Sequence, residues 1–265
     1  MKTRFGGKKL NIAFSFLAVI VMWAGWLIAY YTVRNDYVIP SFVDTVTGIG
    51  RNLIDGQFWR AFGATLLRTL YSWAVAFALS LVCLSLSALS DKFRCFLAPF
   101  VSVLRTLPTM AITLMLLIWT SPKIAPTIVA FLMIFPLSYT QLCASFGGID
   151  KKLIEMAEVY KVSRRDKLCK IYIPLMLPDI FAQTGANISL TLKVMISAEV
   201  LAGTFGSVGG LMYAASMYSR IDELFAVTIL MLVFGGLIEY ALGNLTRITD
   251  VWVKGRGKAR KGGGT

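Results

Sequence analysis

Arg105, Lys193 and Glu199 are among the charged residues that lie inside otherwise apolar stretches. A charged side chain at the centre of a bilayer costs at least a few kcal/mol when it faces lipid, so such residues usually face protein, water or another chain. Lys193 and Glu199 are six residues apart, about 240° around a helix, and cannot pair within it. One interpretation is that Arg105, Lys193 and Glu199 line a translocation pathway for a small anion that Arg105 and Lys193 attract. The other is that both cations are structural and bind helix carbonyls at kinks.

The chain offers few groups for covalent chemistry. It contains no histidine, the commonest general base and metal ligand. Its four cysteines have no metal-ligand spacing, and we interpret them as small buried hydrophobes or free thiols. Ser189 and Lys193 are four residues apart on one helix face, and this is the one candidate for a Ser–Lys dyad. Such pairs often arise by chance, so an intramembrane enzyme such as a lipid transferase is an alternative with little support.

The composition indicates a membrane protein. Of 265 residues, 57% are hydrophobic and 15% are charged, and the mean hydropathy is +0.69. Soluble domains carry roughly a quarter charged residues. Six apolar stretches are long enough to cross a hydrocarbon core of about 30 Å as helices. We therefore expect an all-α polytopic protein with six transmembrane helices at about residues 11–33, 61–90, 96–119, 124–146, 179–202 and 224–245.

The positions of the basic residues predict the orientation of these spans. The two tails, residues 91–95 and the loop at 147–178 together carry 19 Lys and Arg residues, and the loops on the opposite side carry 5. The remaining three, Arg68, Arg105 and Lys193, lie inside spans. Because basic residues accumulate on the cytoplasmic side, we expect both termini and the 147–178 loop in the cytoplasm. The net charge of +13 is thus explained by contact with the membrane and not with nucleic acid.

The 147–178 loop is the one long polar segment between two spans. Asp150 is placed to cap a helix on which Leu153, Met156 and Tyr160 form an apolar stripe. Such a stripe requires a groove on a soluble partner. The alternative is a solvated loop whose apolar residues pack on the membrane helices.

A second short helix is expected in the same loop. Ser163 followed by Asp166 matches a capping box, which predicts a helix that starts near Arg164. Ile173-Pro174 is expected to end this helix, because the residue before a proline is pushed out of the helical region.

The segments expected on the external side and the C-terminal tail also allow structural predictions. Residues 34–60 contain apolar residues at helical spacing and predict a short interfacial helix. The sequence GTFGSVGG at 203–210 predicts a break, followed by a short helix before the last span. The tail at 247–265 is basic and has the composition of a disordered segment. We therefore divide the chain at about residues 60 and 246, with the N-terminal tail, the first span and the external segment in 1–60.

Several motifs resemble those of binding-protein-dependent ABC importer permeases. EMA at 155–157, Lys161 and IYIP at 171–174 resemble the EAA signature, EAA-x3-G-x9-I-x-LP. IPS at 39–41 resembles the family's LPSP, LRTLPTMA at 104–111 resembles LRxIPxxA, and LIW at 117–119 lies near the place of LWFG. FP at 135–136 and SAE at 197–199 after Lys193 resemble FFP and R-x5-AE. The matches cover residues 39–246 and resemble the nitrate/sulfonate/taurine branch.

The resemblance implies a type I ABC importer transmembrane domain over residues 61–246. It implies that the 147–178 loop inserts into a groove on a separate ATP-binding subunit. The residues it places at this contact are Glu155, Met156, Ala157, Lys161, Arg164, Arg165 and Pro174. It also implies two copies of the ATPase subunit, a second permease copy, an extracytoplasmic solute-binding protein and the cell membrane of a prokaryote. No G-x4-GK[ST] loop occurs in the sequence, so we expect ATP to be bound by the partner and the chain to have no catalytic, cofactor or metal site.

Two departures from the EAA pattern matter. Met156 replaces an alanine, and Lys161 stands at the usual glycine. If that position requires a positive φ, lysine costs about 1 kcal/mol or more. The substrate expected from the branch is a small anionic or zwitterionic solute. A stand-alone secondary carrier or channel is the alternative, and Glu199 is its one clear midmembrane carboxylate.

Overall fold

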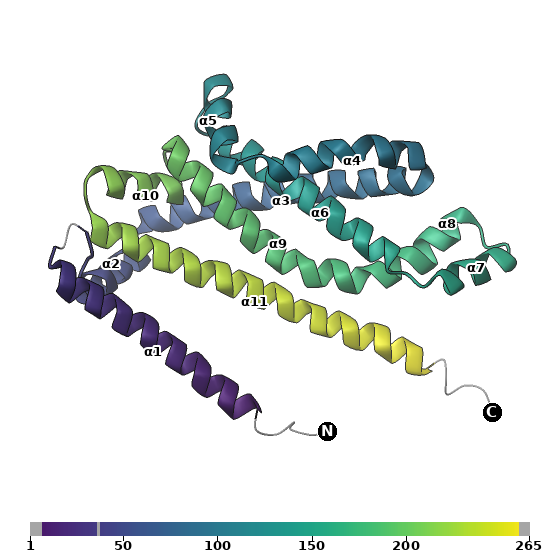
Figure 1. The fold of residues 1–265 in the computed structure, drawn as a ribbon, viewed down its shortest axis with the longest axis horizontal. Helices are drawn as coiled ribbons and strands as arrows, with labels where there is room; N and C mark the ends of the chain where they lie inside the picture. Colours follow the sequence, from purple (N-terminus) through teal and green to yellow (C-terminus); the bar gives the residue numbers. More distant parts are fainter. Residues whose placement is uncertain (1–6, 36–37, 260–265) are drawn as a thin grey trace.

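All secondary structure in the described residues is helical. A computed structural model describes residues 7–35 and 38–259, and for some helical residues, 164, 165 and 244–259 among them, it describes the backbone alone. The elements are α1 (Gly7–Val33), α2 (Phe42–Ile54), α3 (Gly56–Leu89), α4 (Asp91–Thr106), α5 (Thr109–Trp119), α6 (Ala125–Gly147), α7 (Lys151–Val159), α8 (Arg164–Lys167), the π-helical turn η1 (Leu168–Tyr172), α9 (Ile173–Ala202), α10 (Val208–Met217) and α11 (Ile221–Ala259) (Figure 1). The expected all-α class is confirmed.

Four helical stretches in the described residues are long and apolar enough to cross a membrane: 56–89, 125–147, 170–202 and 221–243. The pair α4 and α5 makes a fifth span if the two are counted together. The apolar part of α1 among the described residues, Ile20–Val33, is shorter. The protein is therefore a multi-pass membrane protein, and the described residues support four or five of the six expected spans.

The expected third span, 96–119, is not one helix. α4 and α5 meet at an angle of 97°. Leu107 and Pro108 both have extended backbone conformations between them. Proline disfavours a helical residue before it and has no N–H to continue the hydrogen-bond ladder, so α4 ends and α5 begins afresh at Thr109. The expected third span therefore consists of two helices that are separated at Leu107 and Pro108.

The buried face of α3 consists largely of small residues. Thr65, Thr69, Ser72, Ala76, Ser80, Cys83 and Ser87 recur every three or four residues along it, and all are buried. Three of the hydroxyls reach α6: Ser72 donates to the Thr127 carbonyl at 3.1 Å, Ser80 donates to the Phe135 carbonyl at 3.1 Å, and the Ser87 and Tyr139 hydroxyls bond each other at 2.8 Å. Small residues let helices approach closely in lipid, where interhelical hydrogen bonds supplement van der Waals packing.

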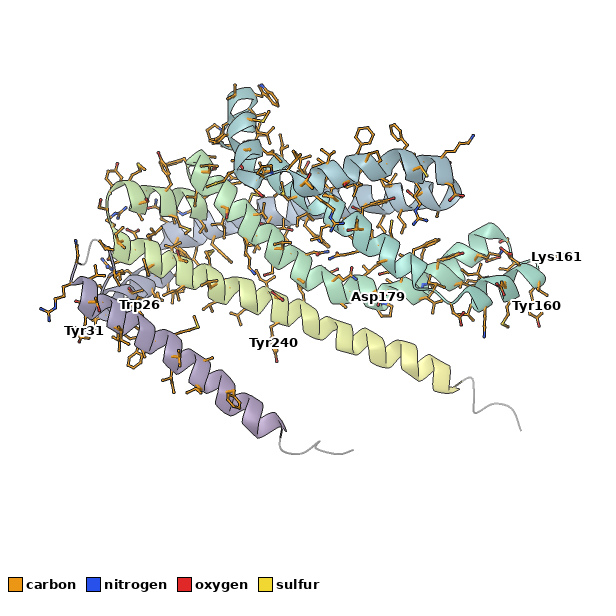
Figure 2. All side chains as sticks on the ribbon, viewed as in Figure 1. Trp26, Tyr31, Tyr160, Lys161, Asp179 and Tyr240 are labelled. Carbon is orange, nitrogen blue, oxygen red and sulfur yellow. The ribbon has the colours of Figure 1, made fainter. Side chains whose placement is uncertain are left out.

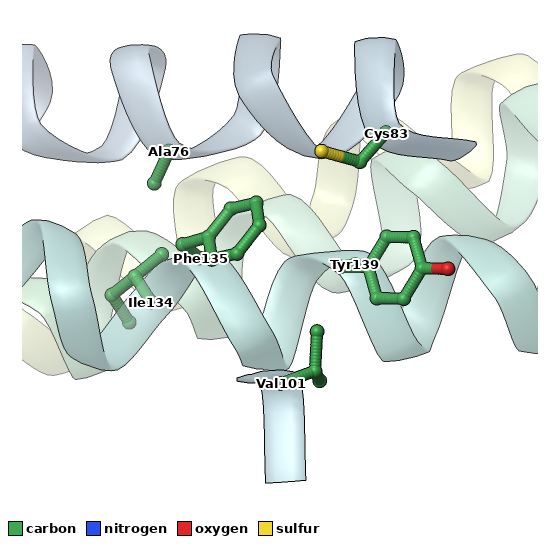
Figure 3. Close-up of a cluster of buried hydrophobic side chains, with 6 residues drawn as sticks. All are labelled: Ala76, Cys83, Val101, Ile134, Phe135 and Tyr139. Carbon is green, nitrogen blue, oxygen red and sulfur yellow. The ribbon is translucent and has the colours of Figure 1, made fainter. Parts of the chain in front are cut away.

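α3, α6 and α9 pack together at the centre of the bundle, and α11 runs along α9 (Figure 1). Between α3, α4 and α6, the side chains of Ala76, Val101, Ile134, Phe135 and Tyr139 form a buried cluster (Figure 3). α1 lies at the edge of the bundle. Its C-terminal half is held by aromatic contacts of Trp23 and Trp26 with α2 and α11 and by a hydrogen bond from the Trp26 indole N–H to the Pro40 carbonyl.

The expected end of the second loop helix at Pro174 is wrong. From Arg164 the chain stays helical through α8, η1 and α9, so the fifth span is continuous with the loop. Pro174 lies in the first turn of α9, where a missing N–H is tolerated, and the wider π-helical turn precedes it. The helix that begins beside the predicted docking segment thus ends only at Ala202.

The short helices predicted around the glycine-rich segment and after the first span are confirmed. α9 ends at Gly203, which has φ +59°, and Ser207 caps α10 by accepting from the Gly210 N–H. At the C-terminus, α11 continues to Ala259, so residues 247–259 are helical where composition predicts disorder. Composition reports the average polarity of the tail alone. It does not detect that the preceding span is already helical, so that each further residue extends that helix at little cost in free energy. Residues 260–265 lie outside the described residues.

Candidate functional site

The helix α7 presents an apolar stripe to solvent. Asp150 caps it as predicted, accepting the Lys152 N–H at 3.0 Å. Leu153, Met156 and Tyr160 are 43%, 56% and 77% exposed, and they lie on the loop that projects from one end of the bundle (Figure 2). The stripe is therefore free of the membrane helices.

The opposite face of α7 packs on the protein itself. Ile154 contacts the buried cluster that includes Leu142 and Ile149, and Ala157 is only 5% exposed. The alternative that the loop packs on the bundle thus applies to this face alone. Of the residues placed at the ATPase contact, Glu155 and Met156 face outward and Ala157 faces inward. The small side chain of Ala157 lets α7 approach the bundle.

Lys161 occupies a left-handed position at the end of α7. Its φ is +52°, as the family glycine suggested. Its N–H donates to the Glu158 carbonyl at 2.9 Å, and the Val162 N–H donates to the Ala157 carbonyl at 3.0 Å. These two bonds form a Schellman motif, in which glycine is the preferred residue. A non-glycine residue there costs about 1–2 kcal/mol.

The predicted capping box fixes the start of α8. The Asp166 N–H donates to Ser163 Oγ at 3.1 Å, and Ser163 Oγ donates to the Asp166 carboxylate at 2.9 Å. Lys170 pairs with Asp166 at 2.7 Å. The Lys170 ammonium, followed by the Ser163 hydroxyl, lowers the pKa of Asp166 below its ordinary value, so this box weakens only as pH falls through that lowered pKa. The side chains of Arg164 and Arg165 lie outside the described residues, and Pro174 is half-buried in α9.

Glu199 is fully buried, and both oxygens of its carboxylate accept hydrogen bonds. Its carboxylate accepts from Arg68 Nη1 at 2.9 Å, Thr65 Oγ1 at 2.9 Å and the Gly209 N–H at 3.3 Å. The Val208 N–H in turn donates to Thr65 Oγ1 at 3.0 Å. The network joins α3, the end of α9 and the start of α10.

Sequence reasoning missed Arg68 as the partner of Glu199. The sequence did contain a signal for this pair. A buried carboxylate requires a cation, and Arg68 is one of the three cations inside the spans. The carboxylate on which the secondary-carrier alternative depends is therefore part of an ion pair.

Gly209 allows this arrangement. A Cβ at that position would lie 2.3 Å from the Glu199 Cβ and 2.6 Å from the Val200 nitrogen, both far inside contact distance. The N-terminal turn of α10 can approach the carboxylate only because residue 209 has no side chain. The positive end of the α10 helix then adds to the stabilisation of the buried anion.

The other two intramembrane cations have no partner in the described residues. Arg105 and Lys193 are both exposed, and neither forms an ion pair or a side-chain hydrogen bond with a described residue. The interpretation that they bind helix carbonyls at kinks is therefore not supported there. Ser189 Oγ is buried and has no hydrogen-bond partner, while Lys193 is exposed, so the two do not form a dyad.

These features define a helical membrane protein that exposes an apolar stripe on the loop of α7 and α8. Residues 86–247, more than half of the chain, match the family of binding-protein-dependent transport system inner membrane components. The chain belongs to this family and is a permease subunit of an ABC importer.

Relatives agree with the expected branch. The chain is 23% identical over 235 residues to the aliphatic sulfonates permease SsuC of Bacillus subtilis, covering 88% of this chain and 84% of that protein. It is 21% identical over 253 residues to the taurine permease TauC of Escherichia coli, covering 92% and 90%. A bacterial alginate ABC transporter, solved with its alginate-bound periplasmic protein, has a similar fold, with a TM-score of 0.62 at 17% identity, covering 91% of this chain and 96% of that chain.

We predict that Glu199→Gln destabilises the protein by about 3 kcal/mol, because it leaves Arg68 without a counter-ion at a largely buried site. Unfolding in detergent micelles measures the loss. Glu223→Gln, which breaks the exposed pair with Arg220, is the control and should cost less than about 1 kcal/mol. Adding Arg68→Gln should restore part of the loss. Equal losses of stability in Glu199→Gln and Glu223→Gln would contradict a structural role for the buried pair.

We predict that Lys161→Gly stabilises the protein by about 1 kcal/mol and leaves ATPase coupling intact, because glycine adopts a positive φ without strain. Lys152→Gly, the same change at a helical position of α7, should instead destabilise by up to about 1 kcal/mol. Denaturant unfolding compares the two. A loss of coupled transport in Lys161→Gly would show that the lysine side chain itself contacts the partner.

Proposed function

We propose that the chain forms, with a second copy of itself, the translocation pathway of an importer for small organic sulfonates or similar anions and zwitterions. An extracytoplasmic binding protein delivers the solute, and two separate ATP-binding subunits drive transport. ATP is bound by those subunits and not by this chain. The names of the relatives, which handle aliphatic sulfonates and taurine, support the substrate class.

The exposed stripe on α7 carries the docking part of this proposal. Three large apolar side chains on a cytoplasmic loop lose water contact only when a partner covers them. The rigid Schellman turn and the capped α8 hold the stripe at a fixed angle to the bundle. Since α8 continues into α9, a displacement of the loop by the ATPase is transmitted to a membrane-spanning helix.

The arrangement of the helices supports the proposed orientation. The α7–α8 loop and the last turns of α11 lie toward one end of the molecule, α2 and α10 lie toward the other, and α1 runs from the middle toward α2 (Figure 1). We infer that the first end is cytoplasmic, with both termini, in the cell membrane of a prokaryote. The basic residues concentrate in the segments at that end.

We predict that Met156→Asp abolishes co-purification of the ATPase subunit, because a carboxylate in the centre of the stripe must be desolvated on docking. Met217→Asp is the matched control, since Met217 is 61% exposed on α10, on the proposed external side. It should leave co-purification unchanged. Retention of the ATPase by Met156→Asp would overturn the assignment of the docking site.

We predict that Lys193→Met lowers uptake of ethanesulfonate into proteoliposomes of the assembled importer by about tenfold, a loss of about 1.4 kcal/mol. The unpartnered ammonium inside the fifth span would otherwise attract the anion. Lys92→Met removes an exposed cation of α4 and should leave uptake unchanged. Unaltered uptake by an intact Lys193→Met assembly would remove Lys193 from the pathway.

A further inference from the structure

An open groove of about 510 Å³ lies between α4 and α6. Seven of its lining residues carry polar or polarisable groups: Arg94, Ser102, Arg105, Thr106, Tyr139, Thr140 and Cys143. Val101 and Tyr139, which belong to the buried cluster of Figure 3, form part of its wall. No carboxylate is among the described residues that line it.

Two arginines on one face of α4 give the groove its charge. Arg94 and Arg105 are eleven residues apart, close to three full turns, so they point to the same side about 16 Å apart along the axis. Neither guanidinium forms an ion pair or a hydrogen bond with a described side chain or carbonyl. Both are therefore available to a ligand.

Of the four neutral hydroxyls that line the groove, those of Thr106, Tyr139 and Thr140 are already engaged, and Thr106 Oγ1 donates to the Val103 carbonyl at 2.9 Å. Tyr139 and Ser87 bond each other, and Thr140 Oγ1 donates to the Pro136 and Leu137 carbonyls at 2.9 Å. The donors that remain for a ligand are the two guanidinium groups and Ser102. A planar guanidinium matches two oxygens of a sulfonate or another oxyanion, so this donor set selects for negative charge.

The position of the groove connects it with transport. α4 starts at Asp91, in the segment assigned to the cytoplasmic side, and ends next to the break at Pro108. Two unpaired cations on this helix would cost at least a few kcal/mol each in contact with lipid, so the face must border water or a second chain. The groove thus extends from the interior of the membrane to the cytoplasmic end of the bundle.

We propose that this groove is an anion-binding site in the cytoplasmic half of the pathway, in which Arg105 and then Arg94 bind the oxyanion group of the solute on its way to release. The inference rests on the proposed function and adds the place in the fold where the oxyanion group is bound and the residues that bind it. Arg94 is assigned here as a second pathway residue beside Arg105.

A single cysteine in the groove tests the proposal. Ser102→Cys is made in a chain whose four native cysteines are replaced, and the assembled importer is treated with an anionic and with a cationic methanethiosulfonate reagent. The anionic reagent should react faster relative to the cationic one, and Arg94→Gln with Arg105→Gln should lower this rate ratio by at least about tenfold. Lys92→Gln, on another face of the same helix, should leave the ratio unchanged.

Protection of the introduced thiol by ligand gives a second measurement. Ethanesulfonate should protect the thiol introduced by Ser102→Cys saturably, and the neutral ethyl methyl sulfone should not. Each single arginine replacement should raise the ethanesulfonate concentration for half-protection by about tenfold. Equal protection by the two compounds, or a rate ratio indifferent to both arginines, would overturn the proposal. Co-purification of the ATPase and coupling of its ATP hydrolysis are measured on the same samples. If both are retained while the rate ratio or the protection contradicts the proposal, the result refutes the anion site and not the permease function.

Discussion

Polar groups inside a bilayer must find their partners within the protein, because lipid offers none. The face of α3 that meets α6, α9 and α10 satisfies this constraint with small hydroxyl side chains. Ser72, Ser80 and Ser87 tie α3 to α6, and the amides of Gln141 and Asn187 bond each other between α6 and α9. The core of the bundle is thereby held in one arrangement.

The buried pair of Arg68 and Glu199 extends the same principle to charge. It fixes the C-terminal end of α9 to α3 and places the start of α10 against a carboxylate. The other end of α9 runs without interruption through η1 into α8. One continuous helical element therefore joins the proposed ATPase contact to the segment that contains α10. A rigid element with both ends anchored is the kind of connection through which coupling between distant sites can pass.

Local signals in the sequence predicted the local structure well. The caps at Asp150 and Ser163, the break after Ala202 and the short helix α10 depend on neighbouring residues and were confirmed. Pro174 was misassigned because a proline suits both the stretch after a helix and the first turn of one, and the sequence does not distinguish the two. Arg68 and Glu199 are 131 residues apart, so helical periodicity cannot bring them together. The groove between α4 and α6 likewise depends on how two helices pack and has no sequence signature.

In the proposed orientation, the positions of the unpartnered cations along their helices give their depths in the membrane. Lys193 lies nine residues from the external end of α9, about 14 Å along the axis, and Arg105 lies fourteen residues from the start of α4, about 21 Å. In a hydrocarbon core of about 30 Å, both reach its middle part from opposite sides. Arg94, near the start of α4, then lies at the cytoplasmic boundary. An anion that moves inward thus meets cations near the middle of the membrane and again at its exit, and no carboxylate lines the groove between Arg105 and Arg94 in the part of the chain that the structure describes.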